Sequence, residues 1–200
     1  MKTIIGSLVC LTFAGCGLLP HRAEFITEKK ALAQANLQSN GIFAFEVANH
    51  IGADVEVDFV HQESGKKYRI DFTPSFSDSI AFWIGPFRAG EKQVAKEVVS
   101  ESVALFQLPA GTYTPIRIYW TSMGQQQSGR PAKGNPFQIF AGKITSGGNL
   151  QILGESGILF ISNLRIESGT ESIDPQIRTV RAPHVSQREI VPVRIQVALN

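Results

Sequence analysis

The sequence contains almost no cysteine, has little net charge and lacks the short signatures of common enzymes. Its two cysteines, Cys10 and Cys16, both lie near the N terminus, so no thiol remains in the rest of the chain for a disulfide framework or a metal cluster. The formal net charge is only +2, and the basic residues form no stripe of the kind that nucleic acids require. There is no G-x-S-x-G elbow, no H-E-x-x-H pair, no phosphate-binding glycine loop and no dinucleotide fingerprint. We therefore expect a protein that is not an enzyme and that binds no nucleic acid, no metal and no other cofactor.

The first residues carry the features of a bacterial secretion signal. Lys2 gives a basic start, residues 4–14 are apolar, and Phe13-Ala14-Gly15-Cys16 resembles a lipobox, in which small residues precede the acylated cysteine. The apolar run is shorter than the roughly 20 residues that cross a bilayer. We expect cleavage before Cys16 and a diacylglycerol group on its sulfur. An ordinary signal peptide cut nearby is the alternative, because Leu is more usual at the position of Phe13.

The lipid at Cys16 predicts a protein that is anchored to a membrane without spanning it. Each buried methylene contributes about 0.8 kcal/mol, so two or three acyl chains hold a protein firmly. Gly17 follows the cysteine, whereas lipoproteins kept at the inner membrane often carry Asp there. This resemblance favours the outer membrane, on its periplasmic face rather than the cell surface. The expected organisation is a cleaved signal at residues 1–15, a tether with a possible short helix at 16–40 and a single domain at 41–200.

From residue 41 onward, apolar and polar residues alternate with a period of two, which is typical of half-buried β-strands. The clearest strand is predicted at residues 54–59. It is expected to form a hairpin with residues 43–47 through a turn at 49–53, and to pair with residues 67–72. A second hairpin is expected between strands at 100–108 and 112–120. Further strands are predicted at residues 79–87, where a loop is the alternative, and at 137–140, 143–153, 157–167 and 191–199. Many short strands with Gly-rich and Pro-rich turns predict an all-β fold, as an antiparallel β-sandwich rather than a small barrel.

Two segments resemble a known family. Leu108-Pro109-Ala110-Gly111-Thr112-Tyr113, which leads into a β-rich segment, is similar to the turn of transthyretin-like or carboxypeptidase-regulatory-like modules in bacterial surface proteins. Residues 137–150, with Ala141-Gly142-Lys143 and Gly148-Asn149-Leu150, resemble a segment found beside that turn in bacterial lipoproteins. Ser146 and Gly147 depart from the pattern and leave the continuity of that strand open. The resemblance implies a prealbumin-like sandwich at a surface location, and it implies no catalytic residue.

Three groups of residues are candidates for chemistry. Asp54, Glu56 and Asp58 share one face of their strand and could bind a cation or act as paired acids, although a solvated strand face is the expected arrangement. The aromatic stretch at residues 80–87 could form a ligand platform, and core packing is expected instead. The four histidines are dispersed along the chain and are expected to be at the surface or hydrogen-bonded within the fold; they are His21, His50, His61 and His184. His61 and Glu63 are expected to lie on the same side of one strand.

The long polar stretch at residues 121–136 is predicted to be a loop. Its candidate partner contacts are Gln126, Arg130 and Lys133, because loops on a rigid scaffold commonly carry binding residues. The expected function is that of a non-enzymatic binding or structural component of an envelope assembly, with another envelope protein as partner. Two alternatives are a surface-exposed adhesin or ligand binder, and an envelope hydrolase whose carboxylate or serine no motif reveals.

Overall fold

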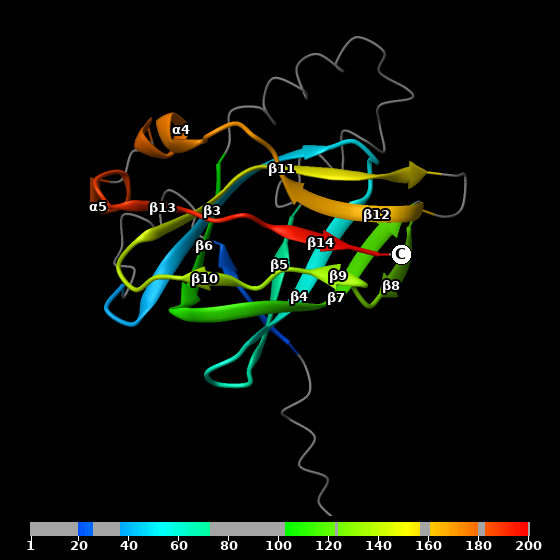
Figure 1. Cartoon of the computed structure of the whole chain (residues 1–200), viewed down its shortest axis with the longest axis horizontal. Helices are drawn as coiled ribbons and strands as arrows, with labels where there is room; N and C mark the ends of the chain where they lie inside the picture. The colour runs from blue at the N-terminus through cyan, green and yellow to red at the C-terminus, as the bar shows by residue number, and fades with distance from the viewer. Residues whose placement is uncertain are drawn as a thin grey trace, which may run out of the picture.

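The computed structural model describes residues 20–25, 37–72, 103–122, 124–156, 161–179 and 183–199, which form two β-sheets and two short helices (Figure 1). The all-β prediction is confirmed. Sheet A runs β1-β5-β4-β7-β10, with β8 also paired to β7. Its strands are β1 His21–Arg22, β4 Asp54–His61, β5 Lys67–Asp71, β7 Gly111–Ser122, β8 Gln125–Gly129 and β10 Phe137–Ile139.

Sheet B runs β2-β6-β3-β11-β12-β14-β9, with β13 also paired to β11. Its strands are β2 Glu24–Phe25, β3 Asn40–Asn49, β6 Ala104–Pro109, β9 Lys133–Gly134, β11 Ile144–Ser156, β12 Ile161–Ser168, β13 Ile190–Pro192 and β14 Gln196–Ala198. Strands expected from alternation occur in both sheets, but the single strand expected at residues 191–199 is divided into β13 and β14, which pair with different strands. The expected strand or loop at residues 79–87 lies outside the described residues.

The inward faces of the two sheets share one apolar core, which the alternation of the sequence predicts. In β4, Val55, Val57 and Phe59 are fully buried. Phe43 and Phe45 of β3 meet them from the opposite sheet, and both belong to the same cluster of buried side chains. Strands from both sheets therefore present alternate residues to a single interior.

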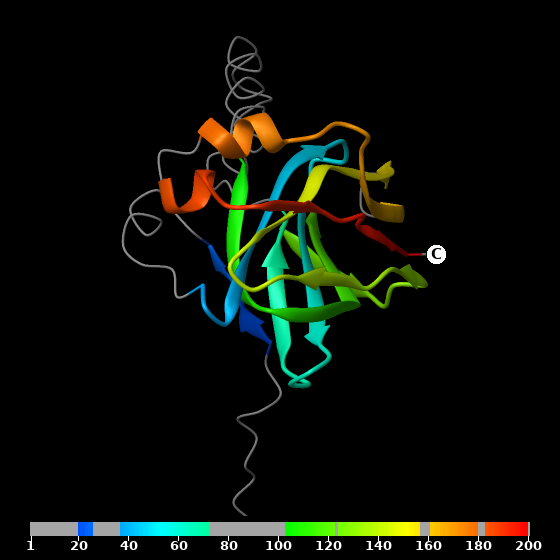
Figure 2. The same cartoon turned by 60° about the vertical axis from the view of Figure 1, so that its left-hand side comes forward.

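The outer face of sheet B is covered by the helices α4 Asp174–Thr179 and α5 Pro183–Ser186 (Figure 2). Ile177 of α4 and Val185 of α5 pack with Ile42 and Ala44 of β3 in a second apolar cluster. Residues 42–45 are therefore buried on both faces of the strand. This explains why the sequence there is apolar without interruption, as in strands that are covered on both sides.

The two hairpins expected from turn residues are wrong. β3 and β4 lie in different sheets, and so do β6 and β7. In each case the turn carries the chain across the core from sheet B to sheet A. Turn residues indicate where a chain reverses direction. They do not indicate whether the next strand pairs with the preceding one in the same sheet or crosses to the opposite sheet, because its apolar face meets the same core in both cases.

The prediction of purely antiparallel sheets is wrong, because both sheets are mixed. β3 pairs in parallel with β11, β11 pairs in parallel with β13, and β1 pairs in parallel with β5. All three pairings join segments far apart in the chain, so no local pattern specifies their direction. β11 runs through Gly147 without a break, and its register with β3 shifts between Ser146 and Gly148. The departure noted at residues 146 and 147 therefore corresponds to an irregularity inside one strand.

Candidate functional site

The predicted loop at residues 121–136 is largely a β-structure. β8 pairs with the end of β7, with Gln126 opposite Thr121, and β9 pairs with β14, with Lys133 opposite Ala198. The indole of Trp120 donates a hydrogen bond to Gln127 across this pair, at 3.1 Å. The loop prediction is wrong because two short strands tie this segment to both sheets.

The candidate contact residues themselves are all at the surface. Gln126, Arg130 and Lys133 are exposed, with Gln126 on β8, Lys133 on β9 and Arg130 on the link between the two strands. Figure 1 shows β8 and β9 beside each other at the end of the molecule where the C-terminal strand finishes. Side chains on an ordered ribbon lose less conformational freedom on binding than those on a mobile loop. Their role as contacts stays a prediction.

The acidic face of β4 is solvated only in part, since Asp54 is exposed whereas Glu56 and Asp58 are held in ion pairs. Asp58 is buried, and its two carboxylate oxygens accept hydrogen bonds from Nε and Nη2 of Arg69, at 2.7 and 3.1 Å. The hydroxyl of Tyr119 donates to the same carboxylate at 3.1 Å, and the Arg69 guanidinium lies 4.0 Å from the centre of the Tyr119 ring. Glu56 accepts from Arg69 at 3.3 Å and from Arg22 of β1 at 3.2 Å. Glu56 and Asp58 are neutralised by arginines and are not arranged to hold a cation.

Arg69 is central to this ion-pair cluster, which consists of Arg22, Glu56, Asp58, Arg69 and Tyr119. Its hydrogen bonds to Asp58 raise the pKa of the guanidinium further, so it stays charged at every relevant pH. Bidentate pairing of this kind is the strongest form of side-chain ion pair. The cluster ties β1, β5, β4 and β7 together on the outer face of sheet A. In the part of the chain that the structure describes, no group of three or more His, Cys, Asp or Glu side chains is placed to hold a metal ion.

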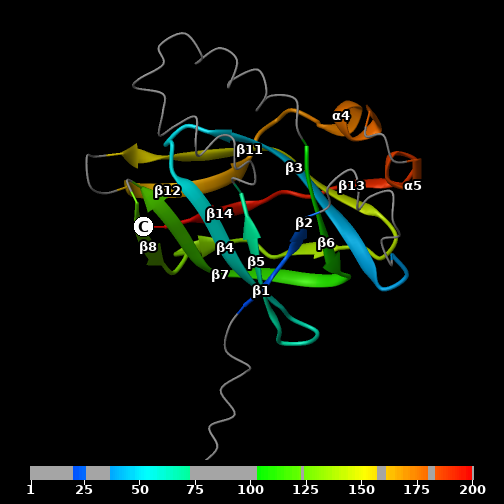
Figure 3. The same ribbon diagram turned by 180° about the vertical axis from the view of Figure 1, so that it is seen from behind.

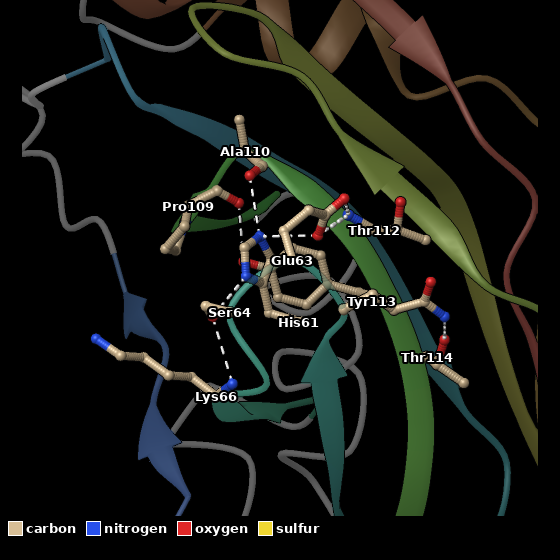
Figure 4. A network of polar contacts seen from close by, with 10 residues as sticks. His61, Glu63, Ser64, Lys66, Pro109, Ala110, Thr112, Tyr113 and Thr114 are labelled. Carbon is tan, nitrogen blue, oxygen red and sulfur yellow. Dashed lines mark hydrogen bonds and ion pairs between the residues drawn. The ribbon is translucent and has the colours of Figure 1, made fainter.

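A second polar network surrounds His61 at the end of β4 (Figure 4). The imidazole is buried; its Nδ1 lies 2.7 Å from Oγ of Ser64, and its Nε2 lies 3.0 Å from the carbonyl oxygen of Ala110. Glu63 reaches Nε2 at 3.3 Å, and its carboxylate accepts the backbone N–H of Thr112 at 2.9 and 3.0 Å. His61 is therefore hydrogen-bonded within the fold, and it joins the turn between β4 and β5 to the turn between β6 and β7.

The turn between β6 and β7 is shaped by this network. The Tyr113 hydroxyl donates to the carbonyl oxygen of Pro109 at 2.8 Å, which is the arrangement of the tyrosine corner found where chains cross between sheets of Greek-key sandwiches. Gly111 has φ of 145°. A Cβ there would lie 2.1 Å from Nε2 of His61 and 2.5 Å from Oε2 of Glu63. Only glycine fits between this backbone and the imidazole.

Ser64, His61 and Glu63 are of the residue types that form the catalytic triad of a hydrolase. The carbonyl of Ala110 can only accept, so Nε2 is the donor in that contact, and Nδ1 faces the Ser64 hydroxyl. The hydroxyl oxygen also accepts the backbone N–H of Lys66 at 3.3 Å. All of these contacts lie within one turn and its neighbour. They are the contacts expected of a polar group that holds a turn, and they leave Nε2 enclosed by backbone.

Two pKa values in the network are displaced. The backbone N–H of Thr112 is the main cause of the lowered pKa of Glu63, and the neighbouring His61 lowers it further. Burial is the main cause of the raised pKa of Tyr113, and the nearby Tyr68 and Glu63 raise it further. The network thus favours a charged Glu63 and a protonated Tyr113 in the folded state.

Glu63 is expected to make folding stability depend on acid pH. Its folded pKa lies below the usual pKa of a glutamate, so its contribution is complete above that usual pKa and is lost as the pH falls through the lower folded value. The melting temperature of Glu63→Gln should therefore fall below that of the wild type at neutral pH, and the two should converge in acid. Melting curves across this range check the expectation. Glu155→Gln, which changes an exposed acid of β11 in the same way, is the control for the general effect of removing one carboxylate.

The remaining candidates are dispersed. His21 is exposed beside the Tyr68 ring, and His50 is exposed with its Nε2 2.6 Å from Oε1 of Gln151. His184 lies in α5. Cys16 and the aromatic stretch at residues 80–87 lie outside the described residues. None of the helices in the described ranges is long and apolar enough to cross a membrane.

Comparisons with known proteins assign no family. No protein-family model matches the chain, and no curated protein matches it. Among solved structures, the chain is similar to a leucine-rich repeat protein from Bacteroides thetaiotaomicron, with 14% sequence identity and a TM-score of 0.32. The likeness covers 57% of this chain and 14% of that chain. It is too distant to carry an argument about fold or function.

Proposed function

We propose that this chain is a lipid-anchored protein of the bacterial cell envelope that acts as a non-enzymatic binding or structural component of an envelope assembly. The observation that carries the proposal is the basic start, apolar run and small-residue cut before Cys16. The proposed location is the periplasmic face of the outer membrane. The proposed partner is another envelope protein.

The described domain supports a binding role in two ways. The acids of β4 and the residues around His61 satisfy one another by hydrogen bonds and ion pairs, which is what polar groups with a structural role do. The exposed polar side chains of β8 and β9 stand on an ordered ribbon instead. A prealbumin-like sandwich is the finer fold that we propose, supported by the turn at residues 108–113 and by its crossing between the sheets.

The anchor predicts a large effect of Cys16→Ala. Without the thiol, the diacylglycerol cannot be attached, and processing at the lipobox should stop. Metabolic labelling with a fatty-acid probe should mark the wild type and leave the variant unmarked, and the variant should keep the higher mass of the precursor. Uptake of label by Cys16→Ala would contradict the anchor.

The contact surface predicts a loss of binding without a loss of stability. Changing Gln126, Arg130 and Lys133 together to Ala removes exposed side chains, so the free energy of unfolding should change by no more than about 0.5 kcal/mol per site. The yield of envelope proteins crosslinked to the variant in intact cells should fall. Changing exposed Gln187 and Arg194 to Ala is the control. An unchanged set of crosslinked partners in the triple variant would count against this surface.

A hydrolase is the second candidate, and the contact chain from Ser64 through His61 to Glu63 is the observation that favours it. The enclosed Nε2 argues for the structural role. Turnover of an ester by the wild type that Ser64→Ala abolishes, with an unchanged melting temperature, would establish the hydrolase instead.

A further inference from the structure

The first described residues of the chain are built into both sheets. β1 runs parallel to β5, with His21 opposite Tyr68, and the N–H of Ala23 donates to the carbonyl of Arg69 at 2.8 Å. β2 follows at once and pairs with β6 of the other sheet. Because β1 and β5 are parallel, β1 begins at the end of sheet A where β5 begins. That end carries the hairpin tip, residues 62–66, and Figure 3 shows β1 and this tip at the same end of the molecule.

The chain between the proposed lipid and β1 is short. Cys16 precedes His21 by five residues, and an extended chain reaches at most about 3.6 Å per residue, so the acylated residue lies within about 18 Å of the start of β1. By comparison, the 12 residues of β7 span about 40 Å. The hairpin tip therefore stays near the bilayer in every orientation that the short link permits.

The predicted contact ribbon lies at the opposite end of sheet A. β4 runs towards the hairpin tip, and its first residue, Asp54, is opposite Thr121 of β7. Thr121 is in turn opposite Gln126 of β8. The end that carries Gln126 is thus one strand length away from the tip, and it points away from the anchor.

The charges at the tip suit an anionic surface. Lys66 and Lys67 are exposed, and Figure 4 shows the Lys66 side chain directed away from the His61 network. The one acid of the tip, Glu63, has its carboxylate on the N–H of Thr112 and beside His61. Glu63 is therefore held against the Thr112 N–H and His61 with its side chain 52% exposed, and the adjacent Lys66 and Lys67 are exposed. A lysine close to an anionic membrane strengthens binding by about fivefold.

We infer that the hairpin tip at residues 62–66 is the membrane-facing end of this domain, and that Lys66 and Lys67 bind the phosphates of anionic lipid headgroups in the bilayer that holds Cys16. The inference rests on the proposed lipid anchor. It leaves the ribbon of β8 and β9 directed away from the membrane, where a second envelope protein can reach it.

Fluorescence quenching in vesicles tests the orientation. Cys10 leaves with the signal and Cys16 carries the lipid, so a single introduced cysteine is the one free thiol of the mature chain. Full-length lipidated Gln62→Cys and Gln126→Cys are labelled with a fluorophore and placed in phosphatidylcholine vesicles, with or without phosphatidylglycerol, that contain a lipid with a headgroup nitroxide. The label at position 62 should be quenched more strongly than the label at 126, and its quenching should increase when phosphatidylglycerol is present, because the basic residues are attracted to the anionic surface.

The lysines are tested in the Gln62→Cys protein. Lys66→Gln with Lys67→Gln should remove the extra quenching caused by phosphatidylglycerol, whereas Arg130→Gln with Lys133→Gln, the same change in charge at the far end, should not. Equal quenching at both labels overturns the orientation, and an anionic-lipid effect that survives loss of both lysines overturns the headgroup contact. A mass spectrum of Cys16 without acyl chains would overturn the anchor itself, and this measurement is independent of the quenching.

Discussion

Asp58→Ala is expected to destabilise the fold by about 3 kcal/mol, because removal of one partner from a buried ion pair leaves the other charge without compensation. Arg69 would lose both of its hydrogen bonds to the carboxylate, and the Tyr119 hydroxyl would lose its acceptor. The value is at the lower end for such pairs because Arg69 keeps Glu56 and is 18% exposed. For a domain of this size the melting temperature should fall by about 6–12 °C, measured by thermal circular dichroism.

Two comparisons separate the loss of this pair from a general effect of charge. Asp54→Ala removes an exposed acid from the same face of the same strand and should lower the free energy of unfolding less than Asp58→Ala, because interactions of an exposed charge are screened by water. Replacing Asp58 and Arg69 together by Leu should destabilise less than Asp58→Ala alone, since no unpaired charge is left. Equal losses of unfolding free energy for Asp54→Ala and Asp58→Ala would show that the ion-pair cluster stabilises the fold no more than a single exposed acid does.

The sequence predicts the inward face of β4 correctly and its outward face wrongly, for one physical reason. Alternation specifies which side chains turn towards the core, because an apolar stripe must leave water. It does not reveal what covers the other face. Arg69 lies 11 residues after Asp58, and Tyr119 lies 61 residues after it. The hairpin between β4 and β5 places Arg69 opposite Asp58, because a short turn sets the register of its strands. The meeting with Tyr119 depends instead on the pairing of β4 with β7, which no local pattern encodes.

The helix α4 was missed although the sequence contains a signal for it. Ile173 and Ile177 are spaced as on one helix face, and both are fully buried. Ser172 accepts the backbone N–H of Asp174 at 3.2 Å, and Pro175 follows at the helix start, where proline is favoured. The helix has six residues, which is short for recognition by periodicity. Packing on sheet B stabilises it more than propensity does.

The candidate sites were predicted unevenly. Gln126 and Lys133 are exposed, as expected. They lie on strands and not on the expected loop, because short polar edge strands resemble loops in composition. The sequence placed His61 and Glu63 on the same side of the chain without predicting a contact, and the two lie 3.3 Å apart. Their contact with residues 110 and 112 required the crossing between sheets, which the expected hairpin had hidden.

Gly111→Ala is expected to destabilise the fold by about 3–5 kcal/mol, because it combines backbone strain with the loss of buried hydrogen bonds. The positive φ of 145° alone strains any side chain, at about 1–3 kcal/mol. The added methyl would also enter the space of the imidazole, at 2.1 Å from Nε2. The buried His61 would have to move, and it would lose its contacts with Ala110 and Ser64, which adds the cost of unsatisfied polar groups.

Gly65→Ala isolates the strain from the clash. Gly65 also has a positive φ, 67°, but a Cβ there meets nothing within 4 Å, so its loss should be about 1 kcal/mol. His61→Ala in the Gly111→Ala background should restore part of the stability by clearing the space, which denaturant unfolding would show as a non-additive double-mutant cycle. If Gly111→Ala costs no more than Gly65→Ala, the imidazole does not require glycine at the corner. If the cycle is additive, His61 and Gly111 act independently, and the turn between β4 and β5 is not held by the turn between β6 and β7.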